Sequence, residues 1–181
     1  ERVMPHITTD TKILNVGAHI GTLAIPLSKL CNSVVAIEAN PETFKLLELN
    51  IALNEISNIK AIKLAASDKE KKIEFLLSRA SSGGSKRVPI NKKYIYYSDK
   101  PEKITVEAAS LDNYLENEYF DIILMDIKGS EYFALKGMQE ILSRSKMLIV
   151  EYLPLYLGEY VWRYNHRNDN IESQKKLIMK Q

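Results

Sequence analysis

Short apolar runs alternate along this chain with segments whose apolar residues recur every three or four positions. Residues 12–16 and 33–39 are runs of strand length, and residues 20–30 and the segment that begins at residue 40 show helical spacing. Pro41 falls in the first turn of the second helix, where its missing backbone N–H is tolerated. The pattern therefore predicts strand, helix, strand and helix in this order.

Two further apolar runs lie in the middle of the chain. Residues 58–66 and 73–77 have strand character, and only a short charged segment separates them. We therefore expect the fourth strand to be a hairpin partner or an extension of the third. Residues 79–88 have the glycine- and serine-containing composition of a loop, which we expect to lie over a surface or a site.

The last third of the chain returns to alternating strands and helices. Residues 119–129 form a nearly continuous apolar run, typical of a strand that is buried on both faces of a parallel sheet. Ser130 is placed to cap a helix over residues 131–142, and residues 146–153 predict another buried strand.

This alternation predicts an α/β fold with a Rossmann-like, doubly wound and mostly parallel sheet. We expect residues 1–181 to form a single domain, with residues 154–181 as a lid, an edge element or the start of a continuation. Ligands of such folds bind outside the carboxyl ends of the strands, so the polar residues at those ends are the candidates for a site.

Composition narrows the class of protein. A chain of 181 residues that is 45% hydrophobic is long enough to bury the core of one ordinary domain. The single cysteine, Cys31, excludes an intramolecular disulfide framework and fits a reducing compartment, so we expect a cytoplasmic protein. No apolar run approaches the roughly 18 residues of a membrane span, and the N-terminal residues lack the apolar core of a signal peptide.

Charge does not by itself predict a nucleic-acid partner, because 25 basic and 23 acidic residues leave a net charge of only +2. Two local stretches keep that possibility open. Residues 85–97 and 162–167 interleave basic and aromatic side chains, a pattern that can follow phosphates and stack on bases. A nucleic-acid methyltransferase acting on RNA therefore remains an alternative to a small-molecule enzyme.

The glycine loop after the first strand carries the main chemical signal. Its pattern, Gly17 followed by Gly21, is neither the dinucleotide fingerprint, since His19 occupies the middle-glycine position, nor a P-loop, which needs a lysine after its last glycine. Glu38 follows Gly17 by 21 residues, near the interval at which an acidic residue meets ribose hydroxyls. An adenosine ligand without a pyrophosphate indicates S-adenosylmethionine.

The sequence also resembles a known family. LNVGAHIG, VVAIEANPETFKLLELNIALN, LAASDKEKKIEF, SLDNYL, IILMDIKGSEYFALKGM and LIVEYLP occur in the order and spacing of the FkbM-type S-adenosylmethionine-dependent methyltransferases, over about residues 10–155. The E-x-N-P and D-x-x-G-x-E-x-x-x-L-x-G blocks are its most specific parts. The resemblance implies O-methylation of a hydroxyl on a sugar, a glycan or a small natural product.

The resemblance also implies roles for individual residues. It places a glycine- and serine-containing loop, residues 81–86, near the acceptor. The residues implied near the reacting groups are Asp126, Lys128 and Glu131, with Asp126 as the leading candidate for a base. The residues implied at the cofactor are Asn15, Gly17, Ala18, His19, Gly21, Glu38, Ala39, Asn40, Ala66, Ser67, Asp68 and Asp126.

Two positions depart from the family pattern. Asn15 stands where the first strand usually ends in an acid, and Lys128 stands where a carboxylate is usual, so a noncatalytic S-adenosylmethionine-binding module is a second alternative. Structural roles are also open for several residues: Asp68 as part of a turn, Glu131 at a helix N-terminus, and Lys128 as an ion-pair partner or a ligand for an anionic acceptor. No cluster of histidine and cysteine requires a metal.

Overall fold

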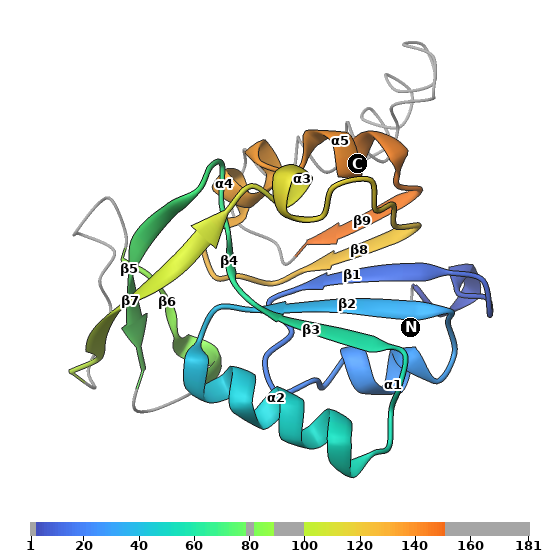
Figure 1. The fold of residues 1–181 in the computed structure, drawn as a ribbon, viewed down its shortest axis with the longest axis horizontal. Helices are drawn as coiled ribbons and strands as arrows, with labels where there is room; N and C mark the ends of the chain where they lie inside the picture. The colour runs from blue at the N-terminus through green and yellow to red at the C-terminus, as the bar shows by residue number, and fades with distance from the viewer. Residues whose placement is uncertain (1–2, 79–81, 89–99, 151–181) are drawn as a thin grey trace, which may run out of the picture.

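The computed structural model describes residues 3–78, 82–88 and 100–150. Its centre is a five-stranded sheet in which every neighbouring pair is parallel (Figure 1). The sheet order is β3-β2-β1-β8-β9, formed by β1 (Lys12–Val16), β2 (Ser33–Glu38), β3 (Ile59–Lys63), β8 (Ile122–Met125) and β9 (Met147–Val150).

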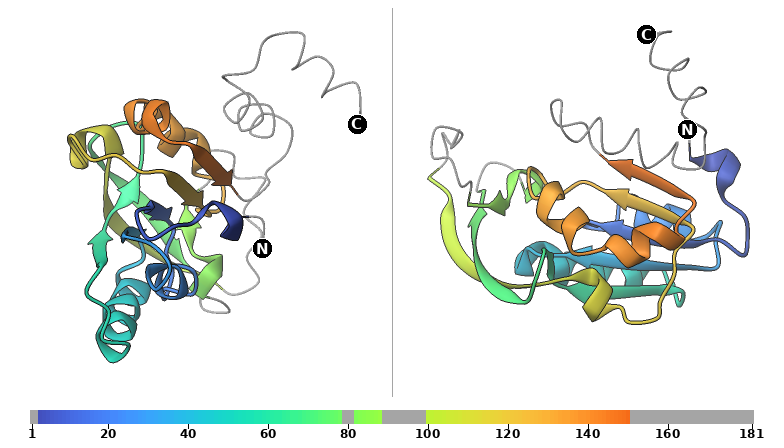
Figure 2. Two further views of the ribbon diagram at one scale, coloured as in Figure 1. Left: turned by 90° about the vertical axis from the view of Figure 1, so that its right-hand side faces the viewer. Right: turned by 90° about the horizontal axis from the view of Figure 1, so that it is seen from above.

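Helices cover both faces of this sheet (Figures 1 and 2). One face carries α1 (Ala24–Ser28) and α2 (Pro41–Leu53), and the other carries α3 (Leu111–Tyr114), α4 (Glu131–Lys136) and α5 (Gln139–Arg144). A short 3-10 turn, η1 (Met4–His6), precedes β1. The predicted Rossmann-like, doubly wound and mostly parallel architecture is confirmed. In the described part of the chain, no helix is both long and apolar enough to cross a membrane.

Alternating strand residues build two apolar layers, one on each face of the sheet. Leu14 and Val16 of β1 pack with Leu111 and Met138 on the side of α3, α4 and α5. Ile13, one position away, belongs to a separate cluster on the side of α1 and α2. Because successive strand side chains point to opposite faces, a strand between two helix layers must be apolar at every position, which explains the continuous apolar runs in the sequence.

A second, four-stranded sheet lies beside the first and was not predicted (Figure 1). Its order is β4-β7-β5-β6, formed by β4 (Ala65–Ala66), β5 (Lys71–Leu77), β6 (Lys86–Arg87) and β7 (Glu102–Ala109), with the 3-10 turn η2 (Ser82–Gly84) before β6. The predicted third strand, residues 58–66, is therefore divided between two sheets. The fourth is not its hairpin partner, because β7 lies between β4 and β5 and pairs with both.

Two predicted helices are shorter than expected, each for a local reason. The helix expected over residues 20–30 is only α1, since Pro26 has no backbone N–H and is tolerated only in a first turn. The helix expected over residues 131–142 is split into α4 and α5 at Gly137 and Met138. Ser130 occupies the N-cap position of α4, but its side chain makes no capping hydrogen bond.

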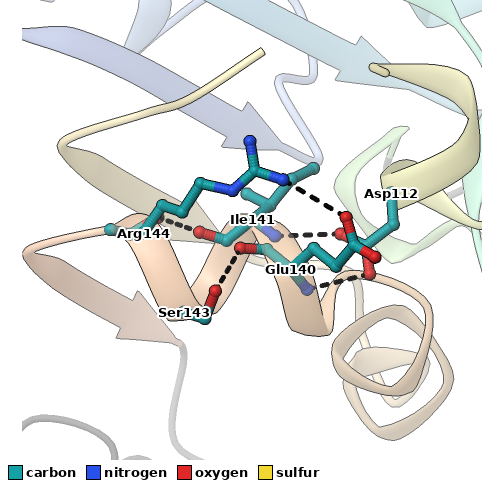
Figure 3. A network of polar contacts seen from close by, with 6 residues as sticks. Asp112, Glu140, Ile141, Ser143 and Arg144 are labelled. Carbon is teal, nitrogen blue, oxygen red and sulfur yellow. Dashed lines mark hydrogen bonds and ion pairs between the residues drawn. The ribbon is translucent and has the colours of Figure 1, made fainter. Parts of the chain in front are cut away.

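The break between α4 and α5 is stabilised by Asp112 from α3 (Figure 3). Its two carboxylate oxygens accept the backbone N–H groups of Glu140 and Ile141, at 3.0 and 2.9 Å, which satisfies two unpaired donors at the start of α5. The Gly137 carbonyl in turn accepts from the Asp112 backbone N–H at 3.0 Å and from the Ser110 hydroxyl at 2.8 Å. The SLDNYL block thus has a structural role.

Gly137 also permits a close contact between the α4–α5 layer and the segment that follows β4. A Cβ at this position would lie 1.9 Å from the carbonyl oxygen of Ser67, in the segment that follows β4. This backbone-to-backbone contact leaves no room for a side chain, although the φ of Gly137 is −96° and would suit any residue.

We expect Gly137→Ala to lower the free energy of unfolding by about 3 kcal/mol, because either backbone must move to admit the methyl group. Gly129 is a matched comparison, since a Cβ there meets no atom within 4 Å but the backbone has a φ of +90°. Gly129→Ala should cost only about 1–2 kcal/mol from backbone strain. Denaturant unfolding of both variants measures the difference, and a smaller loss for Gly137→Ala would contradict the packing argument.

Candidate functional site

A cavity of about 600 Å³ opens at the carboxyl ends of the parallel strands. The order of the sheet reverses direction between β1 and β8, which is the switch point where open α/β sheets bind ligands. Strands β5 and β6 of the second sheet form another wall. Nine of the predicted site residues line this cavity: Asn15, Gly17, Ala18, His19, Glu38, Ala39, Ala66, Asp126 and Lys128.

The glycine loop is shaped by its contacts with the neighbouring strands. Gly17 has a φ of +84°, and a Cβ there would lie 2.1 Å from the carbonyl oxygen of Asp126. The N–H groups of Gly17 and Ala18 both donate to the Ile37 carbonyl, at 2.8 and 2.9 Å. A pyrophosphate site needs such amides for its ligand. Their use within the protein agrees with the sequence argument against a dinucleotide.

Glu38 joins the glycine loop to the end of β2. Its carboxylate oxygens accept the backbone N–H groups of His19 at 2.9 Å and of Asn40 at 2.8 Å. The side chain is buried, and this desolvation raises the pKa of Glu38 above its usual value of 4.5, with the two backbone hydrogen bonds opposing the rise. Each carboxylate oxygen has a second lone pair, so the group can also accept hydroxyls from the cavity.

Asn15 is the most unusual polar residue of the site. It is 2% exposed, lines the cavity, and its Oδ1 has no hydrogen-bond partner in the described structure. A buried polar atom without a partner costs about 1–3 kcal/mol, so such atoms are rare in folded proteins. A residue of the cavity wall therefore carries one buried acceptor that no described protein donor uses.

Asp126 and Lys128 form an ion pair at the end of β8, with Nζ of Lys128 at 3.0 Å from one oxygen of Asp126 and 3.3 Å from the other. The turn behind them has left-handed backbone, with φ of +47° at Lys128 and +90° at Gly129. Glu131 is buried and accepts the N–H of Gly129 at 3.1 Å. It supports this turn and does not line the cavity.

Four other predicted site residues also lie outside the cavity wall. Asn40 caps α2, with Oδ1 accepting from Glu42 N at 3.0 Å and from Thr43 N at 3.4 Å. Gly21 packs against Ile25 and Leu47, since a Cβ there would meet their side chains at 2.8 and 3.0 Å. The remaining two are Ser67 and Asp68.

Asp68 forms an ion pair with Lys71, three residues further along the chain, and also accepts from the Ser67 hydroxyl at 3.1 Å. The hydrogen bond from Lys71 is the largest influence on this carboxylate, and it lowers the pKa of Asp68 from 3.8 to about 2. These local contacts agree with the alternative prediction that Asp68 is part of a turn. Ala66 is the predicted residue of this segment that lines the cavity.

Several lining residues were missed by sequence reasoning, and some of them come from the second sheet. Ile73 and Phe75 belong to β5, and Arg87 belongs to β6. Ser85 lines the cavity as well, and its hydroxyl contacts Asn40 Nδ2 at 3.3 Å. The sequence signals were the loop composition of residues 79–88 and the family resemblance, which placed residues 81–86 near the acceptor and so included Ser85.

The fold and the position of the cavity define a class: this is the architecture of the class I methyltransferases. It is similar to a crystal structure of an FkbM methyltransferase from Methylobacillus flagellatus KT, with a TM-score of 0.52 and 19% identity, over 75% of this chain and 31% of that one. A precorrin 8w decarboxylase from Methanobacterium thermoautotrophicum has a TM-score of 0.52 and 14% identity, over 90% of this chain and 64% of that one.

The family follows from sequence. The model of the methyltransferase FkbM domain matches residues 15–172, so the chain belongs to this family. It is 36% identical over 69 residues to a probable ribosomal RNA small subunit methyltransferase A of Methanosphaera stadtmanae, which covers 38% of this chain and 24% of that protein. It is 24% identical over 127 residues to a probable cobalt-precorrin-6B C(15)-methyltransferase of Methanocaldococcus jannaschii, covering 67% of this chain and 68% of that one.

The ion pair of Asp68 yields a prediction for stability against pH. Because folding lowers the pKa of Asp68 from 3.8 to about 2, the stabilisation is present above pH 4 and is lost as the pH falls towards 2. Asp68→Asn should therefore lower the free energy of unfolding by about 1 kcal/mol at pH 7, allowing for partial exposure of the pair. Denaturant unfolding from pH 7 down to pH 3 checks this, and a cost that does not shrink would contradict it.

Proposed function

We propose that this chain is an S-adenosylmethionine-dependent methyltransferase that binds its cofactor in the cavity at the switch point. The proposed reaction is O-methylation of a hydroxyl on a sugar, a glycan or a small natural product. This part of the proposal rests on the family resemblance. The observation that carries the cofactor assignment is the juxtaposition of a buried carboxylate, Glu38, with an unused buried acceptor, Asn15 Oδ1, on one cavity wall.

Glu38 is suited to the ribose of S-adenosylmethionine. Two adjacent hydroxyls can donate to its two oxygens, whose positions are already set by the backbone N–H groups of His19 and Asn40. Preorganisation of this kind lowers the entropy that binding must otherwise lose. The same hydrogen bonds favour the ionised carboxylate and oppose the rise of the Glu38 pKa that burial causes.

Asn15 is suited to the ammonium of the methionine part. Its Oδ1 is buried, faces no protein donor among the described residues, and would gain its first hydrogen bond from the ligand. The amide replaces the acid usual at this position, so it supplies a hydrogen bond without a full opposite charge. Apolar side chains near the ends of β2 and β4, including Ile37, Leu64 and Ala66, offer surface for an adenine ring.

Asp126 is the leading candidate for contact with the acceptor. When bound, S-adenosylmethionine supplies an electrophilic methyl group, which an acceptor oxygen can displace in line. A protein group that orients the hydroxyl and takes its proton helps this reaction. Asp126 lines the cavity with a half-exposed carboxylate, and Lys128 holds that carboxylate in place through the ion pair.

Two alternatives remain as outcomes of the tests. An RNA acceptor was motivated by residues 85–97 and 162–167, of which only residues 85–88 lie in the described structure. A noncatalytic module was motivated by Asn15 and Lys128. The first alternative predicts measurable binding of RNA. The second predicts binding of S-adenosylmethionine without methyl transfer.

The proposal is tested by calorimetry with S-adenosylmethionine. Glu38→Gln should weaken binding about tenfold to a hundredfold, because a charged acceptor of two hydroxyls becomes a neutral amide. Affinity of the wild-type protein should also fall as the pH drops through the raised pKa of Glu38, since the protonated acid accepts fewer hydrogen bonds. The variant should lack that part of the pH dependence.

Glu42→Gln is the matched control for this titration. Glu42 lies in the first turn of α2, four residues from Glu38 and outside the cavity wall, and its loss removes the same charge. It should leave the affinity unchanged. Equal affinities for the wild-type protein and Glu38→Gln, at melting temperatures that show both are folded, would remove Glu38 from the cofactor site.

Asn15 can be tested with two variants of opposite effect. Asn15→Asp should bind S-adenosylmethionine about tenfold more tightly through an ion pair with the ammonium, while the free protein loses about 2 kcal/mol of stability from a buried charge. Asn15→Leu removes an acceptor that has no partner, so the free protein should keep its stability while affinity falls. Thermal melting with and without ligand measures both effects; affinities that do not differ would refute this role for Asn15.

A further inference from the structure

We propose that the methyl acceptor is a small hydroxyl compound that carries an oxyanion, either a carboxylate or a phosphate monoester, and that Arg87 binds this anion. The inference deepens the proposed methyltransferase function and rests on it, because it assigns the acceptor side of the same cavity. Its evidence is the placement of Arg87, the balance of charge along the cavity wall, and the identity of residue 128.

The position of Arg87 and the contacts of its side chain suit the binding of an anion. It pairs with Phe75 across β5 and β6, and both residues line the cavity. The guanidinium carbon lies 4.1 Å from the centroid of the Phe133 ring, so an aromatic side chain in α4 restrains its position. A guanidinium held over an aromatic ring still has N–H groups with which it can bind a planar oxyanion. In the described part of the chain, no carboxylate pairs with Arg87.

The charges along the cavity wall favour an anionic acceptor. Glu38 and Asp126 contribute two carboxylates, and Arg87 and Lys128 contribute two cations, so the carboxylates and the lysine and arginine cations of the wall are equal in number. S-adenosylmethionine carries a sulfonium and an ammonium against one carboxylate, so its binding would leave one positive charge in excess. An anionic acceptor would offset this excess in a partly desolvated site.

The residue at position 128 points in the same direction. Where a carboxylate is usual in the FkbM family, this chain has Lys128. Its ammonium forms an ion pair with Asp126 in the cavity wall. The acceptor side therefore loses negative charge by two routes: one carboxylate is replaced, and the other is paired. Specificity is a difference between affinities, and a site changed in this way discriminates in favour of anions.

A small acceptor fits Arg87 better than RNA does. Recognition of a polynucleotide uses basic side chains spread along an exposed groove. Arg87 instead faces the cavity, whereas Lys86, its neighbour in the same two-residue strand, is not part of the cavity wall. Adjacent strand residues point to opposite faces, so Lys86 offers a matched control that removes the same charge from the same strand.

The test uses the full chain saturated with S-adenosylhomocysteine and measures binding of glucuronate, glucose 6-phosphate and glucose by NMR titration. The wild-type protein should prefer at least one of the two anions over glucose by about tenfold. Comparison of the two anions distinguishes a carboxylate from a phosphate as the preferred source of charge. Arg87→Ala should reduce the preference to about one, and Lys86→Ala should retain it.

Other outcomes would overturn the assignment. Equal affinity for glucose and both anions, or a preference that survives Arg87→Ala in a folded variant, removes Arg87 from an acceptor site. A short RNA that binds more tightly than either anion, and that loses affinity equally in both variants, makes the basic strand an RNA contact. Failure of S-adenosylhomocysteine to bind the wild-type protein is a separate result: it overturns the proposed function, and the acceptor site with it.

Discussion

The candidate site depends first on the Glu38 carboxylate, which connects two backbone segments that a ligand would have to approach together. One oxygen accepts His19 N from the glycine loop and the other accepts Asn40 N at the start of α2. This clamp brings the carboxyl end of β2 and the turn after β1 to one edge of the cavity. Burial of this carboxylate is unfavourable, which is why the pKa of Glu38 is raised. The proposed ribose contact would explain why a carboxylate is buried at this position.

Close backbone contacts and the second sheet complete the surroundings of the cavity. Gly17 lies against the Asp126 carbonyl, and Gly137 lies against that of Ser67, so two glycines hold elements at distances that no side chain would permit. The second sheet then supplies Phe75 and Arg87 opposite the strand ends. The parallel sheet thus offers the features expected for a cofactor, and the added sheet offers those expected for selection of an acceptor.

Periodicity alone predicted the parallel sheet, because every strand between two helix layers must be apolar throughout. The interval from Gly17 to Glu38 similarly predicted which carboxylate lies beside the glycine loop. The second sheet was missed because its pairings join residues far apart in sequence, such as Ala65 with Ala108, and no local pattern reports them. Arg87 was missed because its strand has only two residues and lies in a segment of loop composition, so it gives no periodic pattern. Asp68 and Glu131, which were assigned to the site, lie outside the cavity wall and have structural partners.

The central claim is that S-adenosylmethionine occupies the cavity between Glu38 and Asn15. A crystal structure of the full chain with S-adenosylhomocysteine tests it most directly, because that product retains both the ribose and the ammonium. We expect ribose hydroxyls within hydrogen-bond distance of the Glu38 carboxylate and the ammonium within hydrogen-bond distance of Asn15 Oδ1. A ligand bound elsewhere, or one in this cavity that leaves Asn15 Oδ1 without a partner, would contradict the account.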